Sequence, residues 1–269
     1  MESNTSEMDT RVQELWRKYL VTGELARETR QRRFFRMLPG TPRCKNCYAP
    51  FKGPGSRVVR VLYGKKPSNL NPQLCNVCEM FAREYPGGAE VELSLLFVDV
   101  RGSTTMAENM NTTEYSRLID RFYKTATNVM VHTDALIDKI IGDQAAGMYV
   151  PGLAGAEHAR RAVQAGLEIL KGAGYGSSGG PWIPLGAGVH TGKAFVGALG
   201  SKEGTTDITV LGDTPNTAAR LSSRAGEGEI LISESACTSA GIDPTGLEKR
   251  SLELKGKSKP MDVWVMLVD

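Results

Sequence analysis

The spacing of hydrophobic and polar positions changes twice along the chain and divides it into three segments. In residues 1–43, apolar side chains between Val12 and Leu20 recur at helical intervals, which predicts an amphipathic helix that needs a partner surface. Residues 44–88 have no regular period and combine paired cysteines with a loop rich in glycine and proline. Residues 89–269 alternate apolar runs with amphipathic stretches, which predicts the strands and helices of a larger domain.

The third segment predicts an α+β fold with one main sheet. Its first apolar run, VELSLLFVDV, has the length and composition of a buried strand. A helix is expected to begin at Thr112 or Thr113, as its capping residue, and to end near Thr133. Two short apolar arms flank Gly142 and Asp143, which predicts a β-hairpin. The remaining expected elements are a helix over 154–171, separate strands in WIPLGAGVHTG and KAFVGALG, a strand in DITVLGD, a helix in PNTAARLSSRAG and two strands in the tail.

Composition and charge place the chain among ordinary globular proteins. Of its 269 residues, 41% are hydrophobic and 23% charged, and the net charge is only +3. Such a balance does not mark a general nucleic-acid or membrane-surface binder. The N-terminus lacks a secretory pattern, and the longest apolar stretch, around Leu95 to Val98, is far too short to span a bilayer. We therefore expect a soluble, cytoplasmic protein.

Four of the five cysteines form two Cys-x-x-Cys pairs, Cys44 with Cys47 and Cys75 with Cys78. In a reducing cytosol such pairs indicate a metal site before a disulfide, and four thiolates can complete the tetrahedral shell of a structural Zn²⁺. The 27 residues between the pairs exceed the commonest zinc-ribbon loop. An iron–sulfur cluster and unligated or redox-active thiols therefore stay open. Cys237 is expected to be a small buried apolar residue in a helix.

A basic stretch closes the first segment. A solvated face is the favoured interpretation, while a contact with RNA or DNA and a dimer arm are alternatives. A nucleic-acid partner is thus not expected. The residues of this stretch are Arg27, Arg30, Arg32, Arg33 and Arg36, next to Phe34 and Phe35.

Two aspartates stand where phosphate chemistry is plausible. Asp99 ends the first buried strand, and the turn Gly102-Ser103-Thr104 that follows can present backbone N–H groups to a phosphate. Asp143 lies at the tip of the expected hairpin, where an aspartate needs no functional explanation. Together, the two carboxylates are able to hold two magnesium ions about 4 Å apart.

Four blocks of the third segment resemble the successive sequence blocks of class III adenylyl and guanylyl cyclases, and they occur in the same order. They are LFVDVRGSTTMAE, KIIGDQAAGMYV, GAGVHTGKAFVGALGS and TVLGDTPNTAARL, within about residues 91–268. The resemblance implies a ferredoxin-like core with extra elements, preceded here by the N-terminal helix and the four-cysteine knuckle. It also implies two protomers arranged head to tail, with active sites across their interface and two Mg²⁺ or Mn²⁺ ions in each.

By resemblance, Asp99, its neighbour Val100, and Asp143 contact the two metal ions, and the turn after Asp99 receives the β- and γ-phosphates. Asn216 and Arg220 match the pair that orients the ribose and stabilises charge on the α-phosphate in this family. These two residues are four positions apart, on one face of a helix.

The base-selecting positions also follow from the resemblance. Lys139 stands where adenylyl cyclases of the family carry lysine, and Thr209 stands at the partner position. A lysine and a threonine can donate to adenine N1 and accept from its amino group, which favours ATP. Lys255 best matches a phosphate-contacting lysine, although the adjacent Lys257 and Lys259 are alternatives.

These assignments predict a homodimeric enzyme that converts ATP into cyclic AMP and pyrophosphate by attack of the ribose 3′ hydroxyl. Alternatives are a cyclase acting on GTP or a pyrimidine triphosphate, a catalytically silent cyclase-like domain, and a nucleic-acid-binding zinc protein. His190 receives no role, because metal-assisted cyclisation requires no such base. The N-terminal helix and the knuckle are expected to hold the dimer in a productive arrangement.

Overall fold

The computed structural model describes residues 2–23, 26–201, 204–257 and 259–268. They form two compact units, each described by itself. The N-terminal unit comprises residues 1–91, 151–153 and 195–211, and the sheet unit comprises residues 92–150, 154–194 and 212–269.

The strands form one eight-stranded sheet, as the alternating pattern predicted. Its order is β2-β3-β1-β4-β6-β8-β7, and β5 pairs with β4 alone. All of these pairings are antiparallel where their register is known, except that β4 runs parallel to β6. The strands are β1 (Gly87–Val100), β2 (Leu136–Ile141), β3 (Gln144–Tyr149), β4 (Leu185–Gly200), β5 (Thr206–Leu211), β6 (Glu229–Ser233), β7 (Glu248–Leu252) and β8 (Met261–Leu267).

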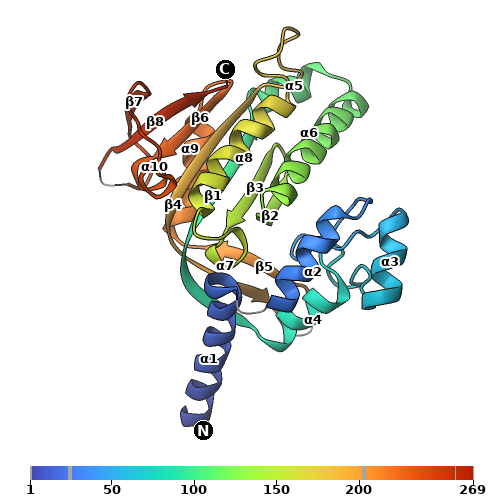
Figure 1. Ribbon diagram of the computed structural model, residues 1–269. Helices are drawn as coiled ribbons and strands as arrows, with labels where there is room; N and C mark the ends of the chain where they lie inside the picture. Colours follow the sequence, from blue (N-terminus) through green and yellow to red (C-terminus); the bar gives the residue numbers. More distant parts are fainter. Residues whose placement is uncertain (1, 24–25, 202–203, 258, 269) are drawn as a thin grey trace. The chain divides into compact units, whose positions relative to one another are not determined.

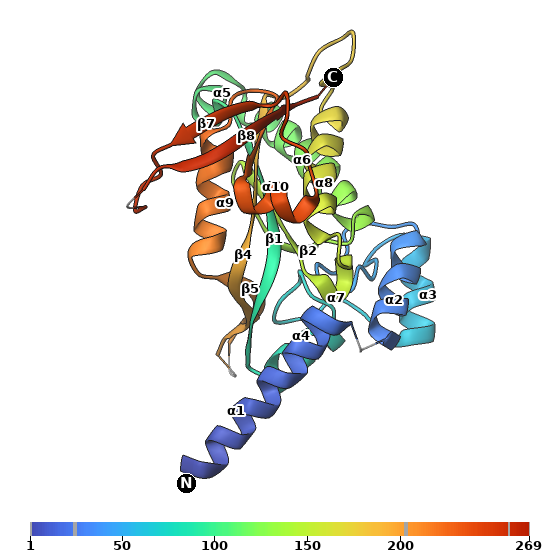
Figure 2. The ribbon, with the colours of Figure 1, turned by 60° about the vertical axis from the view of Figure 1, so that its left-hand side comes forward.

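Helices cover both faces of the sheet. On one face, α6 and α8 lie side by side across the strands, as Figure 1 shows. In the turned view of Figure 2, α9 lies on the opposite side of β4 from these two helices. The helices of the sheet unit are α5 (Ser103–Asn109), α6 (Thr112–His132), α8 (His158–Gly172), α9 (Asp213–Arg224) and α10 (Glu234–Ala240). The short helix α7 (Pro151–Ala154) falls mainly in the N-terminal unit.

Two expectations for this unit need correction. The N-cap of α6 is Asn111, whose side chain accepts a hydrogen bond from the Thr113 N–H, and not Thr112 or Thr113. The two strands expected around residues 182–200 are one continuous strand, β4. Its glycines do not end it, because they allow close approach of neighbouring backbone. A Cβ added at Gly188 would strike the backbone of Ser222 in α9.

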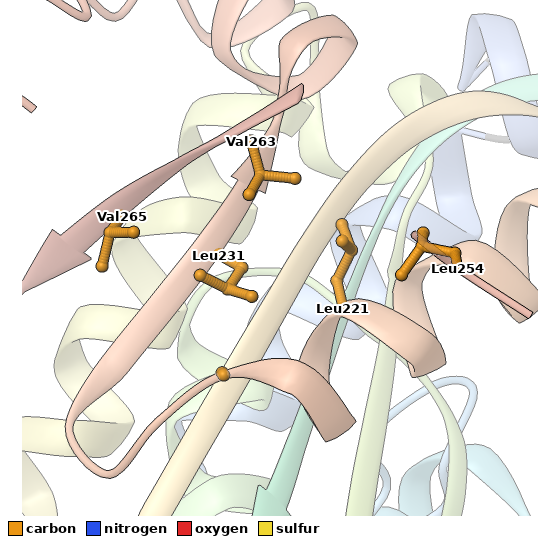
Figure 3. Packing of buried hydrophobic residues seen from close by; sticks show 6 residues of the cluster. Leu221, Leu231, Leu254, Val263 and Val265 are labelled. Carbon is orange, nitrogen blue, oxygen red and sulfur yellow. The ribbon is translucent and has the colours of Figure 1, made fainter. Parts of the chain in front are cut away.

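A hydrophobic cluster fixes α9 against the end of the sheet that β6 and β8 form. Figure 3 shows Leu221 of α9 facing Leu231 of β6, with Val263 of β8 and Leu254 beside them. All four side chains are buried, and burying one such side chain stabilises the fold by about 1.5–3 kcal/mol. The cluster therefore holds in place the helix that carries Asn216 and Arg220, together with the loop that precedes Lys255.

The N-terminal unit contains more than the single helix expected over residues 1–43. Its helices are α1 (Glu2–Arg17), continued by a π-helical turn (Lys18–Thr22), α2 (Ala26–Met37), α3 (Pro54–Tyr63) and α4 (Asn76–Glu84). Gly23 adopts a left-handed conformation (φ 63°) and ends the first helical stretch.

The predicted apolar face of the first helix does find a partner surface. Trp16 is fully buried, packs its ring edge against Phe81 of α4 at 5.4 Å between centroids, and donates to the carbonyl of Tyr85 at 3.1 Å. The Tyr19 hydroxyl donates to Asn46 Oδ1 at 2.7 Å. The helix is thus anchored to the cysteine-containing knuckle.

The basic stretch is only partly a solvated face. The side chains of Arg30 and Arg33 are exposed, whereas Arg32 is buried and its guanidinium lies 4.0 Å from the centre of the Tyr48 ring. Arg36 is half-buried, and the side chain of Arg27 lies outside the described residues. Among the described residues, no helix has the length and apolar character that a membrane span needs.

Candidate active site

The two aspartates lie next to each other because of strand pairing. Asp99 near the end of β1 is paired with Gln144, the first residue of β3, and Asp143 precedes it at the tip of the β2–β3 hairpin. The Val100 N–H donates to the Asp143 carbonyl at 2.9 Å, and the Gln144 side-chain amide donates to Asp99 Oδ2 at 3.3 Å. These two hydrogen bonds hold both aspartates at the same end of the paired strands β1 and β3.

The turn after Asp99 reaches back to the second aspartate. Gly102 adopts a left-handed conformation (φ 65°) as the N-cap of α5, which places Ser103 at the first helical position. The Ser103 hydroxyl donates to Asp143 Oδ2. The predicted phosphate-binding turn and the predicted metal ligands are therefore in direct contact.

Opposing charges act on Asp99. Burial raises the pKa of its carboxyl, the Arg101 guanidinium lowers it, and the neighbouring Asp143 carboxylate raises it, so the pKa lies above its ordinary value. Arg101 forms an ion pair with Asp99 and also donates to the carbonyls of Ser223 (2.9 Å) and Ala225 (3.3 Å) at the end of α9. Two adjacent carboxylates and the main-chain oxygens around them are hard oxygen ligands, the kind that Mg²⁺ and Mn²⁺ prefer.

An open pocket of about 680 Å³ adjoins the Asp143 carboxylate. Asp143 and Gly142 line it at the hairpin tip, and the hydroxyl of Tyr123 in α6 donates to the Gly142 carbonyl at 2.7 Å. Ser103 and Thr104 line the same pocket. Its wall thus combines carboxylate, hydroxyl and main-chain groups beside the expected metal ligands.

The pair on α9 has the predicted arrangement. Asn216 is exposed and Arg220 is half-buried, one helical turn apart. The Arg220 guanidinium lies against Gly256, so that a Cβ there would stand 3.4 Å from its Nη2 atom. Lys257 forms an ion pair with Asp213 at the start of α9, whereas the side chain of Lys255 is exposed.

The two residues predicted to select the base belong to different units. Lys139 is exposed on β2 in the sheet unit, next to an irregularity in the pairing of β2 with β3. Thr209 is half-buried on β5 in the N-terminal unit, opposite Gly197 of β4.

The pKa of His190 lies well below its ordinary value. Burial lowers its pKa, the nearby Lys257 lowers it further, and Asp213 opposes both, which leaves the pKa at about 4. Its Nδ1 atom and the Ser233 hydroxyl are 2.8 Å apart. The imidazole is therefore neutral near pH 7 and has a polar partner inside the protein.

Sequence reasoning did not assign roles to Arg101 and Gln144, although each contacts Asp99. A signal for Arg101 was present in its position two residues after Asp99, directly behind the last residue of β1. Gln144 becomes a neighbour of Asp99 only through the pairing register.

Comparison with known proteins identifies the family. A sequence model described as "Adenylate and Guanylate cyclase catalytic domain" matches residues 89–267, more than half of the chain. The chain belongs to this family. The resemblance stated on four sequence blocks is thereby confirmed, and so is the fold class.

Individual relatives of the cyclase family are similar at modest identity. An adenylate cyclase of Anabaena cylindrica is 28% identical over 181 residues, which are 64% of this chain and 36% of that protein. Adenylate cyclase 1 of Rhizobium meliloti (strain 1021) is 27% identical over 184 residues, which are 64% of this chain and 27% of that protein. The chain thus spans about a third of the length of these relatives.

Solved cyclase structures share the fold. The guanylyl cyclase Cya2 superimposes with a TM-score of 0.59 at 28% identity, covering 66% of this chain and 93% of that one. The adenylyl cyclase CyaB from P. aeruginosa gives a TM-score of 0.57 at 25% identity, covering 67% of this chain and 95% of that one. The chain therefore contains a nucleotide cyclase catalytic domain, and the similar structures include cyclases of both base preferences.

The pKa of His190 gives a prediction about this cyclase domain. The folded protein keeps the imidazole neutral down to about pH 4, whereas an unfolded chain protonates near pH 6.5. The resulting contribution to stability is complete above about pH 6.5 and is lost as the pH falls toward 4. In an NMR titration, the ring protons of His190, assigned with a His190→Gln variant, should not shift between pH 5.5 and 8. A midpoint between pH 6 and 7 would contradict the burial argument.

Proposed function

We propose that the protein converts ATP into cyclic AMP and pyrophosphate. The observation that carries the proposal is the contact between the ends of β1 and the β2–β3 hairpin, which sets Asp99 beside Asp143 in a chain of the cyclase family. The adenylate cyclases of Anabaena cylindrica and Rhizobium meliloti support the choice of ATP, as does Lys139. With ATP as substrate and five unpaired cysteines, we place the enzyme in the cytoplasm.

The proposed metal-binding residues are Asp99, Val100 and Asp143. When bound there, two Mg²⁺ or Mn²⁺ ions supply activation of the ribose 3′ oxygen and neutralisation of charge on the leaving pyrophosphate. In the reaction, the 3′ oxygen bonds to the α-phosphorus, the bond from that phosphorus to the bridging oxygen breaks, and the 3′ proton leaves to solvent. We assign Gly102, Ser103 and Thr104 to the β- and γ-phosphates. Ser103 and Thr104 line the pocket next to Asp143, and Gly102 is the N-cap of α5.

Asn216 and Arg220 act on the reacting end of the substrate in this proposal. Arg220 keeps its charge at every relevant pH, which suits it to stabilise the charge that develops on the α-phosphate. Asn216, one turn earlier on the same face of α9, orients the ribose. The same chain therefore carries metal-binding and transition-state residues, so that two copies can complete two identical sites across a twofold interface.

A guanylyl cyclase activity is the alternative that a specific observation favours. Cya2, a guanylyl cyclase, is similar to this chain at 28% identity. Another similar structure is the catalytic core of a rhodopsin-guanylyl cyclase with converted specificity, in complex with ATPαS. We propose that Lys139 and Thr209 select adenine by donating to N1 and accepting from the amino group.

Replacing Asp99 tests the metal assignment. Asp99→Asn preserves size and removes the charge, so cyclisation should fall roughly 100-fold or more, with a weaker apparent affinity for Mn²⁺ and an unchanged thermal midpoint. The matched control is Asp243→Asn. Asp243 is an exposed loop residue that accepts a hydrogen bond from the Thr245 N–H, and the amide oxygen of asparagine can accept the same bond. Activity of Asp99→Asn equal to that of the control would contradict the assignment.

Mixing two inactive variants tests the shared site. Asp99→Ala and Arg220→Ala should each be inactive as homodimers. In an equal mixture, half of the dimers contain one copy of each variant and one intact site, so activity should return to about a quarter of the wild-type value. If the mixture stays as inactive as either variant alone, although exchange of subunits is shown by labelling, the site does not lie across a homodimer interface.

A further inference from the structure

The two cysteine pairs converge on one point in the N-terminal unit. The sulfur atoms of Cys44, Cys47, Cys75 and Cys78 all lie within 4.8 Å of one another, and all four side chains are buried. Cys47 Sγ and Cys75 Sγ are 3.7 Å apart. Four sulfurs bound tetrahedrally at about 2.3 Å from a Zn²⁺ ion would be separated by about 3.8 Å. The arrangement is therefore close to that of a single tetrahedral ion.

An iron–sulfur cluster fits this arrangement less well. A cluster places at least two iron atoms with their bridging sulfides between the cysteine sulfurs, which spreads these sulfurs apart. Here even the longest separation stays within 4.8 Å, whereas the 3.7 Å between Cys47 Sγ and Cys75 Sγ is well beyond the about 2.05 Å of a disulfide bond. The geometry thus favours a single metal ion over both a cluster and a pair of disulfides.

The surroundings of the sulfurs suit thiolates. The Cys75 N–H points at Cys44 Sγ (3.2 Å), the Cys78 N–H at Cys75 Sγ (3.4 Å), and the Asn46 side-chain amide at Cys78 Sγ (3.4 Å). Zn²⁺ with four thiolates has a net charge of −2, which such donors stabilise. The buried, positively charged Lys65 lines the same cavity as Cys47 and Cys78.

The knuckle around these sulfurs also holds β5. Lys45 stands between the first two cysteines. Its side chain is only 6% exposed, and its ammonium group lies 2.5 Å from Asp207 Oδ1. Asn71, four residues before Cys75, donates to the Thr206 carbonyl at 3.1 Å and to Asp207 Oδ1 at 3.3 Å. Both contacts reach the first residues of β5, the strand that carries Thr209.

The two halves of the knuckle depend on each other at this contact. The Lys45 N–H donates to the Gln73 carbonyl at 2.9 Å, which joins the first cysteine pair to the segment before the second. Asp207 also accepts from the Ile208 N–H at 2.9 Å, so its position is coupled to the backbone of β5. Opening of the cysteine cluster would therefore release Lys45 and Asn71 together.

We propose that Cys44, Cys47, Cys75 and Cys78 bind one structural Zn²⁺ ion and that the knuckle so formed fixes the β4–β5 hairpin through Lys45 and Asn71. Binding displaces the four thiol protons to solvent and involves no redox step. A consequence, which rests on the proposed function, is that the zinc knuckle sets the position of the base-selecting Thr209.

Metal analysis tests the zinc site without reference to catalysis. The purified full-length chain should contain one zinc per chain, and Cys44→Ser and Cys75→Ser should lose it. Cys237→Ser, at a buried thiol outside the cluster, is the matched control and should retain it. If the serine variants do not fold, titration of the wild type with a mercurial should release one zinc as four thiols react. Wild-type protein without zinc, or with iron in its place, would overturn the proposal.

Hydrogen exchange tests the link to β5 separately from both zinc and turnover. Lys45→Met should keep its zinc, while the amides of Asp207–Leu211 exchange at least about 10-fold faster, because the ion pair between Lys45 and Asp207 is lost. Lys52→Met, at an exposed lysine outside the cluster, is the control and should leave this exchange unchanged. If the protein is active, KM for ATP should rise more than kcat falls. Equal exchange of these amides in the two variants would overturn the coupling between the knuckle and β5. Faster exchange in Lys45→Met alone would support this coupling even if the protein has no cyclase activity.

Discussion

The antiparallel pairing of β1 with the β2–β3 hairpin is the constraint on which the candidate site depends. It brings together two carboxylates, Asp99 and Asp143, that repel each other. A hydrogen bond from the Val100 N–H to the Asp143 carbonyl fixes their main chains, and hydrogen bonds from Gln144 and Ser103 fix the side chains. The sheet therefore supplies the stability needed to hold like charges side by side. Such a pair of carboxylates favours the binding of divalent metal ions.

The second half of the site depends on packing. Leu221 of α9 is buried against Leu231 of β6, and this contact orients the face of α9 that carries Asn216 and Arg220. Arg101 connects the two halves, because it pairs with Asp99 and donates to carbonyls at the end of α9. A change in either half should therefore be felt in the other.

Local sequence patterns predicted the elements that are determined by neighbouring residues alone. The hairpin at Gly142 and Asp143 followed from its turn, and the two Cys-x-x-Cys pairs came together as expected. The interruption of β4 expected at Gly192 was wrong, because Gly192 lies in close contact with Thr214 of α9 and does not form a turn. The helical period of residues 1–43 could not show the break at Gly23.

Contacts between distant segments could not be predicted, because local patterns carry no information about which segments meet in the fold. Arg32 has the sequence context of a solvated residue, yet it is buried over the Tyr48 ring. Lys45 pairs with Asp207, more than 150 positions away, and no spacing rule relates the two. The roles carried over for Lys139, Thr209 and Lys255 stay predictions, because they concern a substrate and a second protomer.

The central claim is that this cyclase domain makes cyclic AMP. The most direct measurement incubates the purified chain, across a range of protein concentrations, with ATP, GTP, CTP and UTP in separate reactions containing Mg²⁺ or Mn²⁺, and identifies cyclic products and pyrophosphate by chromatography. Cyclic AMP and pyrophosphate in equal amounts from ATP, with a specific activity that rises with protein concentration as dimers form, is the predicted result. Cyclic GMP from GTP with no product from ATP, or no cyclic product from any of the four, would contradict the account.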